Sequence, residues 1–119
     1  MTTSEPIAVR RRGTVAVIDM AGDVNAGAER ALDEAWAEAV GEQPDAVVLN
    51  FKPAGFINST GIALIVSVLA RARAQGRTVL ACGLSEHYRQ VFSITRLADF
   101  LAINPDEDSA VLGVERSSA

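Results

Sequence analysis

Three short runs of apolar residues, almost uninterrupted by polar ones, constrain the fold of this chain more than any other feature. They lie within residues 14–21, 45–51 and 78–82. A strand with one solvated face alternates apolar and polar residues, so continuous runs indicate strands covered on both faces. Helical patterns separate the runs, at residues 26–40 and from 60 to about 74, and a third begins at Ser85. This succession is typical of parallel βαβ units.

We therefore predict a single α/β domain over residues 1–119, with a mixed, mostly parallel sheet of about four or five strands and about four helices. Residues 7–12 are expected to form a first strand that Gly13 ends in a hairpin turn. Residues 22–25 are expected to form a turn, 52–57 a loop and 100–103 a short last strand. Pro105 is expected to start a final helix, whose Val111 and Leu112 pack back on the core. We expect flexible tails at residues 1–6 and 114–119.

The faces of the two long helices can be assigned from their periodicity. In the first helix the apolar face holds Leu32, Ala35, Trp36, Ala39 and Val40. In the second, the residues expected to pack on the sheet are Ile62, Ile65, Val66, Val68, Leu69 and Ala72. The opposite side of the second helix carries the small residues Ala63, Ser67, Ala70 and Ala74. Such a row of small residues could form a shallow groove that a partner approaches closely. It could equally be a solvent-exposed face whose short side chains favour the helix, and both interpretations stay open.

Composition excludes several classes of protein. The net charge of −4 and a pI near 4.9 argue against nucleic acid or an acidic membrane as a partner, and Arg10-Arg11-Arg12 is too short a cluster to change that. One cysteine and one histidine support neither an internal disulfide nor a metal site. We find no signal-peptide pattern and no apolar run of the ~20 residues that a membrane span needs. A soluble, cytoplasmic protein is expected.

The candidate functional site is the start of the second helix. Asn58, Ser59 and Thr60 follow a buried strand, and in parallel sheets the loops after the strands carry the sites. A phosphate on Ser59 would add a charge of roughly −1.5 to −2 at the positive end of a helix dipole, where anions are favoured. The plainer interpretation is that these residues only cap the helix.

Enzyme chemistry has little support in the sequence. Ser59 as a nucleophile would need a base, and the one imidazole, His87, belongs to another loop and lacks a recognisable third member of a triad. No Gly-rich phosphate loop is present, so we expect no nucleotide cofactor. We also expect no metal, because the one histidine has no plausible co-ligands. A protein-binding module with a modifiable serine is the stronger expectation.

The ordered motifs of the chain resemble those of STAS domains, in particular bacterial anti-sigma factor antagonists. The resemblance rests on Val48-Leu49-Asn50-Phe51 followed by Phe56-Ile57-Asn58-Ser59-Thr60-Gly61-Ile62. Further matching pieces are Gly22-Asp23-Val24, Gly76-Arg77-Thr78-Val79, Cys82-Gly83-Leu84-Ser85 and residues 89–97. The similarity extends from about Ile7 to Gly113, nearly the whole chain.

This resemblance implies a partner-switching protein. An antagonist of this kind binds an anti-sigma factor, which is also a serine kinase of the histidine-kinase-like ATPase fold, and so frees a sigma factor. The kinase phosphorylates the antagonist, which then dissociates, and a PP2C-type phosphatase resets it. The matching acceptor is Ser59, with Thr60 as the second candidate. The docking surface is expected to comprise Phe56, Ile57, Asn58, Ser59, Thr60, Gly61, Ala63, Ser67 and Ala70.

One departure bears on the switch: the family's usual Asp before the serine is Asn58 here. Kinases bring their own base and metal, so the change weakens a phosphoswitch without excluding it. The alternative is a STAS scaffold or ligand sensor in which Ser59 is never modified. The resemblance leaves a homodimer open.

Overall fold

Residues 7–118 of the chain are described by a computed structural model. The strands are β1 (Ile7–Arg12), β2 (Val15–Met20), β3 (Gly22–Val24), β4 (Ala46–Asn50), β5 (Ala54–Ile57), β6 (Val79–Cys82) and β7 (Ala102–Asn104). The helices are α1 (Glu29–Gly41), α2 (Ser59–Ala74), α3 (Glu86–Ile94) and α4 (Glu107–Ser118), with 3-10 turns at Ala26–Ala28 and Leu97–Asp99.

The main sheet has the strand order β1-β2-β4-β6-β7. The β1–β2 hairpin is antiparallel, and the other three strand pairs are parallel. Gly13, at the hairpin, has the positive φ of +62° that favours glycine. The predicted α/β fold with a mixed, mostly parallel sheet is therefore confirmed.

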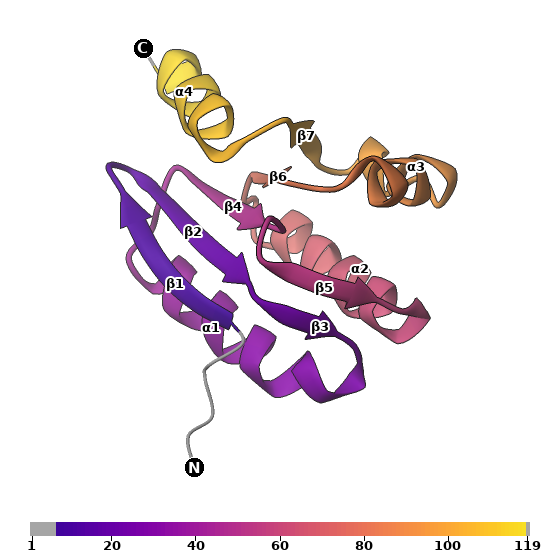
Figure 1. Cartoon of the computed structure of the whole chain (residues 1–119). Coiled ribbons are helices and arrows are strands. Elements are labelled where there is room, and N and C mark those ends of the chain that lie inside the picture. The colour runs from indigo at the N-terminus through magenta and orange to yellow at the C-terminus, as the bar shows by residue number, and fades with distance from the viewer. Residues whose placement is uncertain (1–6, 119) are drawn as a thin grey trace.

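The continuous apolar runs are explained by helices on both faces of this sheet (Figure 1). On one face, Ala16, Ile18 and Leu49 pack in the main core with α1, α2 and Phe92 of α3. On the other face lies a second cluster of buried residues, in which α4 covers β2, β4 and β6: Val15, Val17, Ala46, Val48, Leu80, Cys82, Ala110, Val111 and Val114. Because both faces of each inner strand are buried, apolar residues are favoured at successive positions, which explains the continuous runs.

Two predicted irregular segments are strands. Residues 22–24 and 54–57, expected as a turn and a loop, pair as the parallel strands β3 and β5. This small sheet lies beyond the ends of β2 and β4 (Figure 1). Neither segment has the length or β-branched composition that marks a strand in sequence, so only their mutual pairing reveals them.

Other boundaries and faces also differ from the predictions. The last strand is Ala102–Asn104, since Phe100 follows a 3-10 turn and is exposed. Two side chains expected to pack inwards, Val66 and Leu112, are 45% and 47% exposed. Helix α4 begins after Pro105, at Glu107, and continues to Ser118 with Val114 buried, where a flexible tail was expected. The tail expected at residues 1–6 lies outside the described residues.

The arginines of β1 connect the hairpin to α4. Arg10 forms ion pairs with Asp19 (2.6 Å) and Glu107 (2.7 Å), and Arg12 pairs with Glu107 (3.0 Å) and Asp108 (2.7 Å). Hydrogen bonds from Arg10 hold the pKa of Asp19 and of Glu107 below their ordinary values of 3.8 and 4.5. Arg10 and Arg12 thus form an ion-pair network with the start of α4.

Replacing Arg10 should flatten the acid dependence of stability. A carboxylate whose folded-state pKa is depressed stabilises the fold above its unfolded pKa, and that contribution is lost as pH falls through the folded value. We expect Arg10→Gln to cost at most about 1 kcal/mol at neutral pH, because the pairs are partly exposed. The difference from wild type should shrink as the pH falls below the ordinary pKa values of these carboxyl groups, and vanish only below their depressed folded-state pKa values, where both are protonated.

Urea unfolding between about pH 2 and pH 7, measured for both proteins, tests this expectation. The control is Arg30→Gln, since Arg30 is exposed and makes no ion pair within residues 7–118. A pH-independent difference between wild type and Arg10→Gln would contradict the assignment.

Candidate functional site: the start of helix α2

Asn58 alone caps the helix that carries the candidate phosphoacceptor. Its backbone is extended (φ −90°, ψ −176°), and its side-chain Oδ1 accepts a hydrogen bond from the Gly61 N–H at 2.8 Å. Its carbonyl accepts the first helical bond, from Ile62 N–H, at 2.9 Å. The helix therefore begins at Ser59, one residue before the predicted Thr60. Ser59 and Thr60 are its first two residues, and both are exposed.

Three hydrogen bonds from neighbouring elements fix the segment before the helix. The Phe56 N–H donates to Asp23 Oδ1 (2.9 Å), the Ile57 N–H to the Tyr88 hydroxyl (2.9 Å), and the Asn58 N–H to the Val24 carbonyl (3.2 Å). Strand β3 and helix α3 thus hold β5 and the residue next to Ser59. Sequence reasoning did not assign these roles to Asp23 or Tyr88. The matched motif Gly22-Asp23-Val24 was the available signal.

Gly61 permits the close approach of β3 to the helix start. It is buried, and a Cβ atom there would overlap the Val24 carbonyl oxygen and lie 2.8 Å from its carbon. Because these are backbone atoms, they cannot rotate away as a flexible side chain would. Glycine at this position is therefore a packing requirement of the site.

The first turn of α2 offers unpaired backbone donors beside the Ser59 hydroxyl. The first N–H groups of any helix lack intrahelical acceptors. Here Asn58 satisfies the N–H of Gly61, while those of Ser59 and Thr60 have no acceptor within the described part of the chain. Together with the positive end of the helix dipole, they favour an anion at this point. The Ser59 hydroxyl itself makes no hydrogen bond to a base among residues 7–118.

The nine residues expected to form the docking surface divide by exposure. Phe56 is 78% exposed, and the other exposed members are Asn58, Ser59, Thr60, Ala63, Ser67 and Ala70. Ile57 and Gly61 are buried, so they position the surface without contributing area to it. Val66, half-exposed on the same helix, adds an apolar side chain that the sequence analysis assigned to the core.

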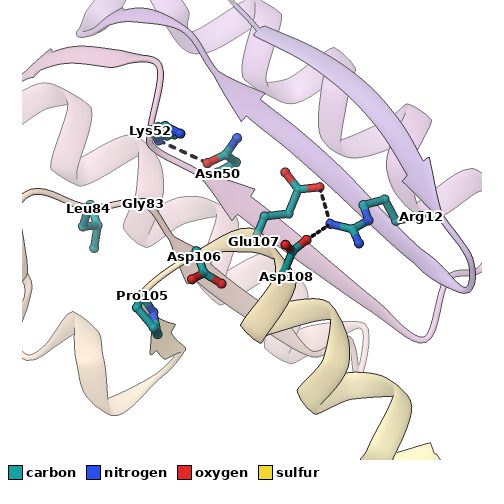
Figure 2. Close-up of a pocket in the computed structure, with 9 residues that line it drawn as sticks. All are labelled: Arg12, Asn50, Lys52, Gly83, Leu84, Pro105, Asp106, Glu107 and Asp108. Carbon is teal, nitrogen blue, oxygen red and sulfur yellow. Dashed lines mark hydrogen bonds and ion pairs between the residues drawn. The ribbon is translucent and has the colours of Figure 1, made fainter.

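A separate hollow of about 580 Å³ lies at the carboxyl ends of β4 and β6 (Figure 2). Arg12, Glu107 and Asp108 line it, and Arg12 is already ion-paired with both carboxylates. Asn50, also on its wall, accepts from the Lys52 N–H and donates to Asp19. Cys82 behind Asn50 is buried, which raises its pKa to about 11, so the thiol stays protonated at neutral pH.

The described residues were also searched for clusters of metal ligands and for membrane-spanning helices. Within residues 7–118, no three histidine, cysteine or acidic side chains gather closely enough to hold a metal ion. None of the helices in that part of the chain is both long enough and apolar enough to span a membrane.

Comparison with known proteins gave matches in family and in fold. The family model of the STAS domain matches residues 6–110. Comparison with curated protein sequences gave no match. Among solved structures, an anti-sigma factor antagonist from Mycobacterium paratuberculosis is 22% identical, with a TM-score of 0.73 over 97% of this chain and 99% of that one.

The anti-sigma factor antagonist SpoIIAA is similar in two states. Its unphosphorylated form is 15% identical, with a TM-score of 0.70 over 92% of this chain and 97% of that one. The phosphorylated form of the Bacillus protein is 18% identical, with a TM-score of 0.68 over 91% and 98%. At these identities the likeness shows a shared fold.

Proposed function

We propose, because the chain belongs to the STAS domain family, that it is an anti-sigma factor antagonist whose binding is switched by phosphorylation of Ser59. Its partner would be an anti-sigma factor that is also a serine kinase of the histidine-kinase-like ATPase fold. Sequestering that factor frees a sigma factor, and a PP2C-type phosphatase restores the binding form. In this role the chain is a regulator and not an enzyme.

The observation that carries the proposal is the setting of the Ser59 hydroxyl. It is exposed, at the first residue of a helix in which the N–H groups of Ser59 and Thr60 are unpaired within residues 7–118. A foreign active site can reach such a hydroxyl, and the helix N-terminus can stabilise the added phosphate. Phosphorylation then need not disturb the fold.

The two forms of SpoIIAA support a switch without refolding. Both the unphosphorylated and the phosphorylated form share the fold of this chain, with TM-scores of 0.70 and 0.68. A change of state in that protein is compatible with one architecture. For this chain we infer that the phosphate weakens binding by adding charge to the interface with the partner, and that it leaves the fold of the chain unchanged.

The residue before the acceptor could cap the helix or assist phosphoryl transfer, and Asn58 is suited only to the first of these roles. Asn58 acts here as the helix cap through its side-chain oxygen, a role that an Asp fills equally well. Its amide carries no charge, so it attracts a metal cation less strongly than a carboxylate does and cannot act as a base. Phosphorylation of Ser59 must therefore depend on the base and metal that the kinase supplies.

Intact-mass measurement tests the modification directly. The chain is incubated with ATP, Mg²⁺ and the cognate anti-sigma kinase, in the wild-type, Ser59→Ala and Thr60→Ala forms. We expect one phosphate on the wild type and on Thr60→Ala, and none on Ser59→Ala. An adduct on Ser59→Ala would move the acceptor elsewhere, and no adduct on any form would favour an unmodified STAS scaffold.

A further inference from the structure

An apolar groove of about 270 Å³ lies at the other end of α2 from Ser59. Val66, Ala70 and Arg73 of α2 form one wall, and Arg96, Leu97 and Phe100, which follow α3, form the other. Phe100 is 58% exposed and Val66 45% exposed. Large apolar side chains that gather around an open groove indicate a surface that a partner covers.

The rim of this groove is cationic, although the chain as a whole is acidic. The guanidinium of Arg73 lies 5.8 Å from the centre of the Phe100 ring and has no carboxylate partner within the described residues. Arg96 donates through Nε to Asp99 at 2.8 Å, which leaves the terminal nitrogens of its exposed side chain unpaired in the described part of the chain. On a chain of net charge −4, this rim selects for acidic partners.

The backbone at Arg96 is a second sign that its side chain is needed at this rim. Arg96 follows the end of α3 with φ +67°, a conformation that favours glycine. A non-glycine residue there costs stability, and such strain is concentrated at functional positions. Within the described residues the side chain of Arg96 donates only to the exposed Asp99, at i+3, so no buried contact explains its presence.

We propose that this groove binds an acidic segment of a partner protein that carries a large apolar side chain. The apolar side chain enters between Ala70 and Leu97, and the flanking carboxylates meet Arg73 and Arg96. A small amphiphile fits less well, because the groove is open and would leave Phe100 and Val66 in water. A partner segment covers both.

The groove shares Val66 and Ala70 with the docking surface, but its arginines lie far from Ser59. Arg73 follows Ser59 by 14 residues of one helix, which corresponds to ~21 Å at 1.5 Å per residue. That is more than twice the Debye length of ~8 Å at physiological ionic strength, so a phosphate at Ser59 has little effect there. The charge of a phosphate at Ser59 is therefore not expected to change the binding of a short acidic peptide in the groove, and this binding can be tested separately from the switch.

The test is a titration of the ¹⁵N-labelled full chain with a short helical peptide in which Phe and Leu are flanked by glutamates. The matched control peptide has glutamine in place of every glutamate. We expect amide shifts confined to residues 66–73 and 96–100, and about tenfold weaker binding of the glutamine peptide. Absence of shifts, shifts elsewhere or equal affinities for the two peptides would overturn the proposal.

Variants separate the charges of the groove from its fold. Arg96→Gly is expected to raise the melting temperature, because glycine relieves the backbone, and to weaken the glutamate peptide about tenfold. Arg73→Gln should weaken it similarly, whereas Arg30→Gln and Ser59→Asp should bind as wild type does. Either groove variant binding at wild-type affinity contradicts the proposal.

Two further occupants are outcomes of the same measurement. Decanoate is titrated in parallel; if it shifts these amides and the glutamate peptide does not, the groove is a lipid site. If the same amides shift with the concentration of the protein alone, a second copy of this chain occupies it. Either result overturns the assignment to an acidic partner segment.

Discussion

Ser59→Asp is expected to weaken the complex with the anti-sigma partner about a thousandfold and to leave the melting temperature of the free protein unchanged or slightly raised. The substitution places a permanent carboxylate at the first residue of α2. For the free protein an acidic side chain at a helix N-terminus is favourable by at most about 1 kcal/mol. The fold therefore tolerates the charge.

We expect the proposed partner not to tolerate it, because the surface that we predict to contact the partner around Ser59 is uncharged. Its exposed members are an aromatic residue, small residues and neutral polar residues: Phe56, Asn58, Thr60, Ala63, Ser67 and Ala70. An anion brought into such an interface loses water without gaining a counter-charge, which costs several kcal/mol. About 4 kcal/mol corresponds to a thousandfold loss of affinity.

Calorimetry with the purified anti-sigma factor, together with thermal unfolding of each variant, measures both quantities. Ser59→Ala is the neutral control and should bind as wild type does. Thr60→Asp places the same charge one residue later and tests how closely the effect depends on position. Wild-type affinity in Ser59→Asp would refute the charge mechanism, and a large fall in its melting temperature would mean that the fold had changed as well.

Gly61→Ala is expected to destabilise the protein by about 3 kcal/mol or more and to lower its melting temperature by roughly 10 °C. The added methyl group would overlap the carbonyl of Val24, a backbone atom of β3. To accept it, β3 must move away from α2. The Asn58 N–H would then lose its bond to the same carbonyl.

Gly113→Ala is the matched control, because it makes the same change within a helix where nothing lies within 4 Å of the added Cβ. Since alanine is the better helix former, it should stabilise the protein by about 0.5–1 kcal/mol. Urea unfolding of both variants gives the comparison. Equal effects of the two substitutions would mean that the contact at Gly61 does not limit packing.

The inner strands of the main sheet could be predicted from the sequence, because each of them appears as a local pattern of residues. The runs at 14–21, 45–51 and 78–82 became inner strands, each covered on two faces. The apolar face predicted for the first helix is buried at Leu32, Ala35, Trp36 and Ala39. The caps were equally local, since Asn58 and Ser85 each accept from an N–H three residues on.

Features that depend on distant partners escaped prediction. Strands β3 and β5 pair although some 30 residues separate them, and neither segment resembles a strand alone. The arginines of β1 find Glu107 and Asp108 at the other end of the chain. Val66 and Leu112 are apolar residues that the described elements cover only in part, since they are 45% and 47% exposed. Periodicity records how apolar a position is and not what lies against it.

Short-range periodicity and capping chemistry were enough to predict three features: the fold class, the strands that are buried on both faces, and the position of Ser59 at the start of a helix. The residues that hold this helix start in place became apparent only from the folded arrangement. Val24, Asp23 and Tyr88 do so through hydrogen bonds from other elements, and Gly61 by leaving room for a backbone carbonyl. Such contacts form between groups that are far apart in the sequence and that folding brings together. Local sequence patterns do not show which distant groups will meet.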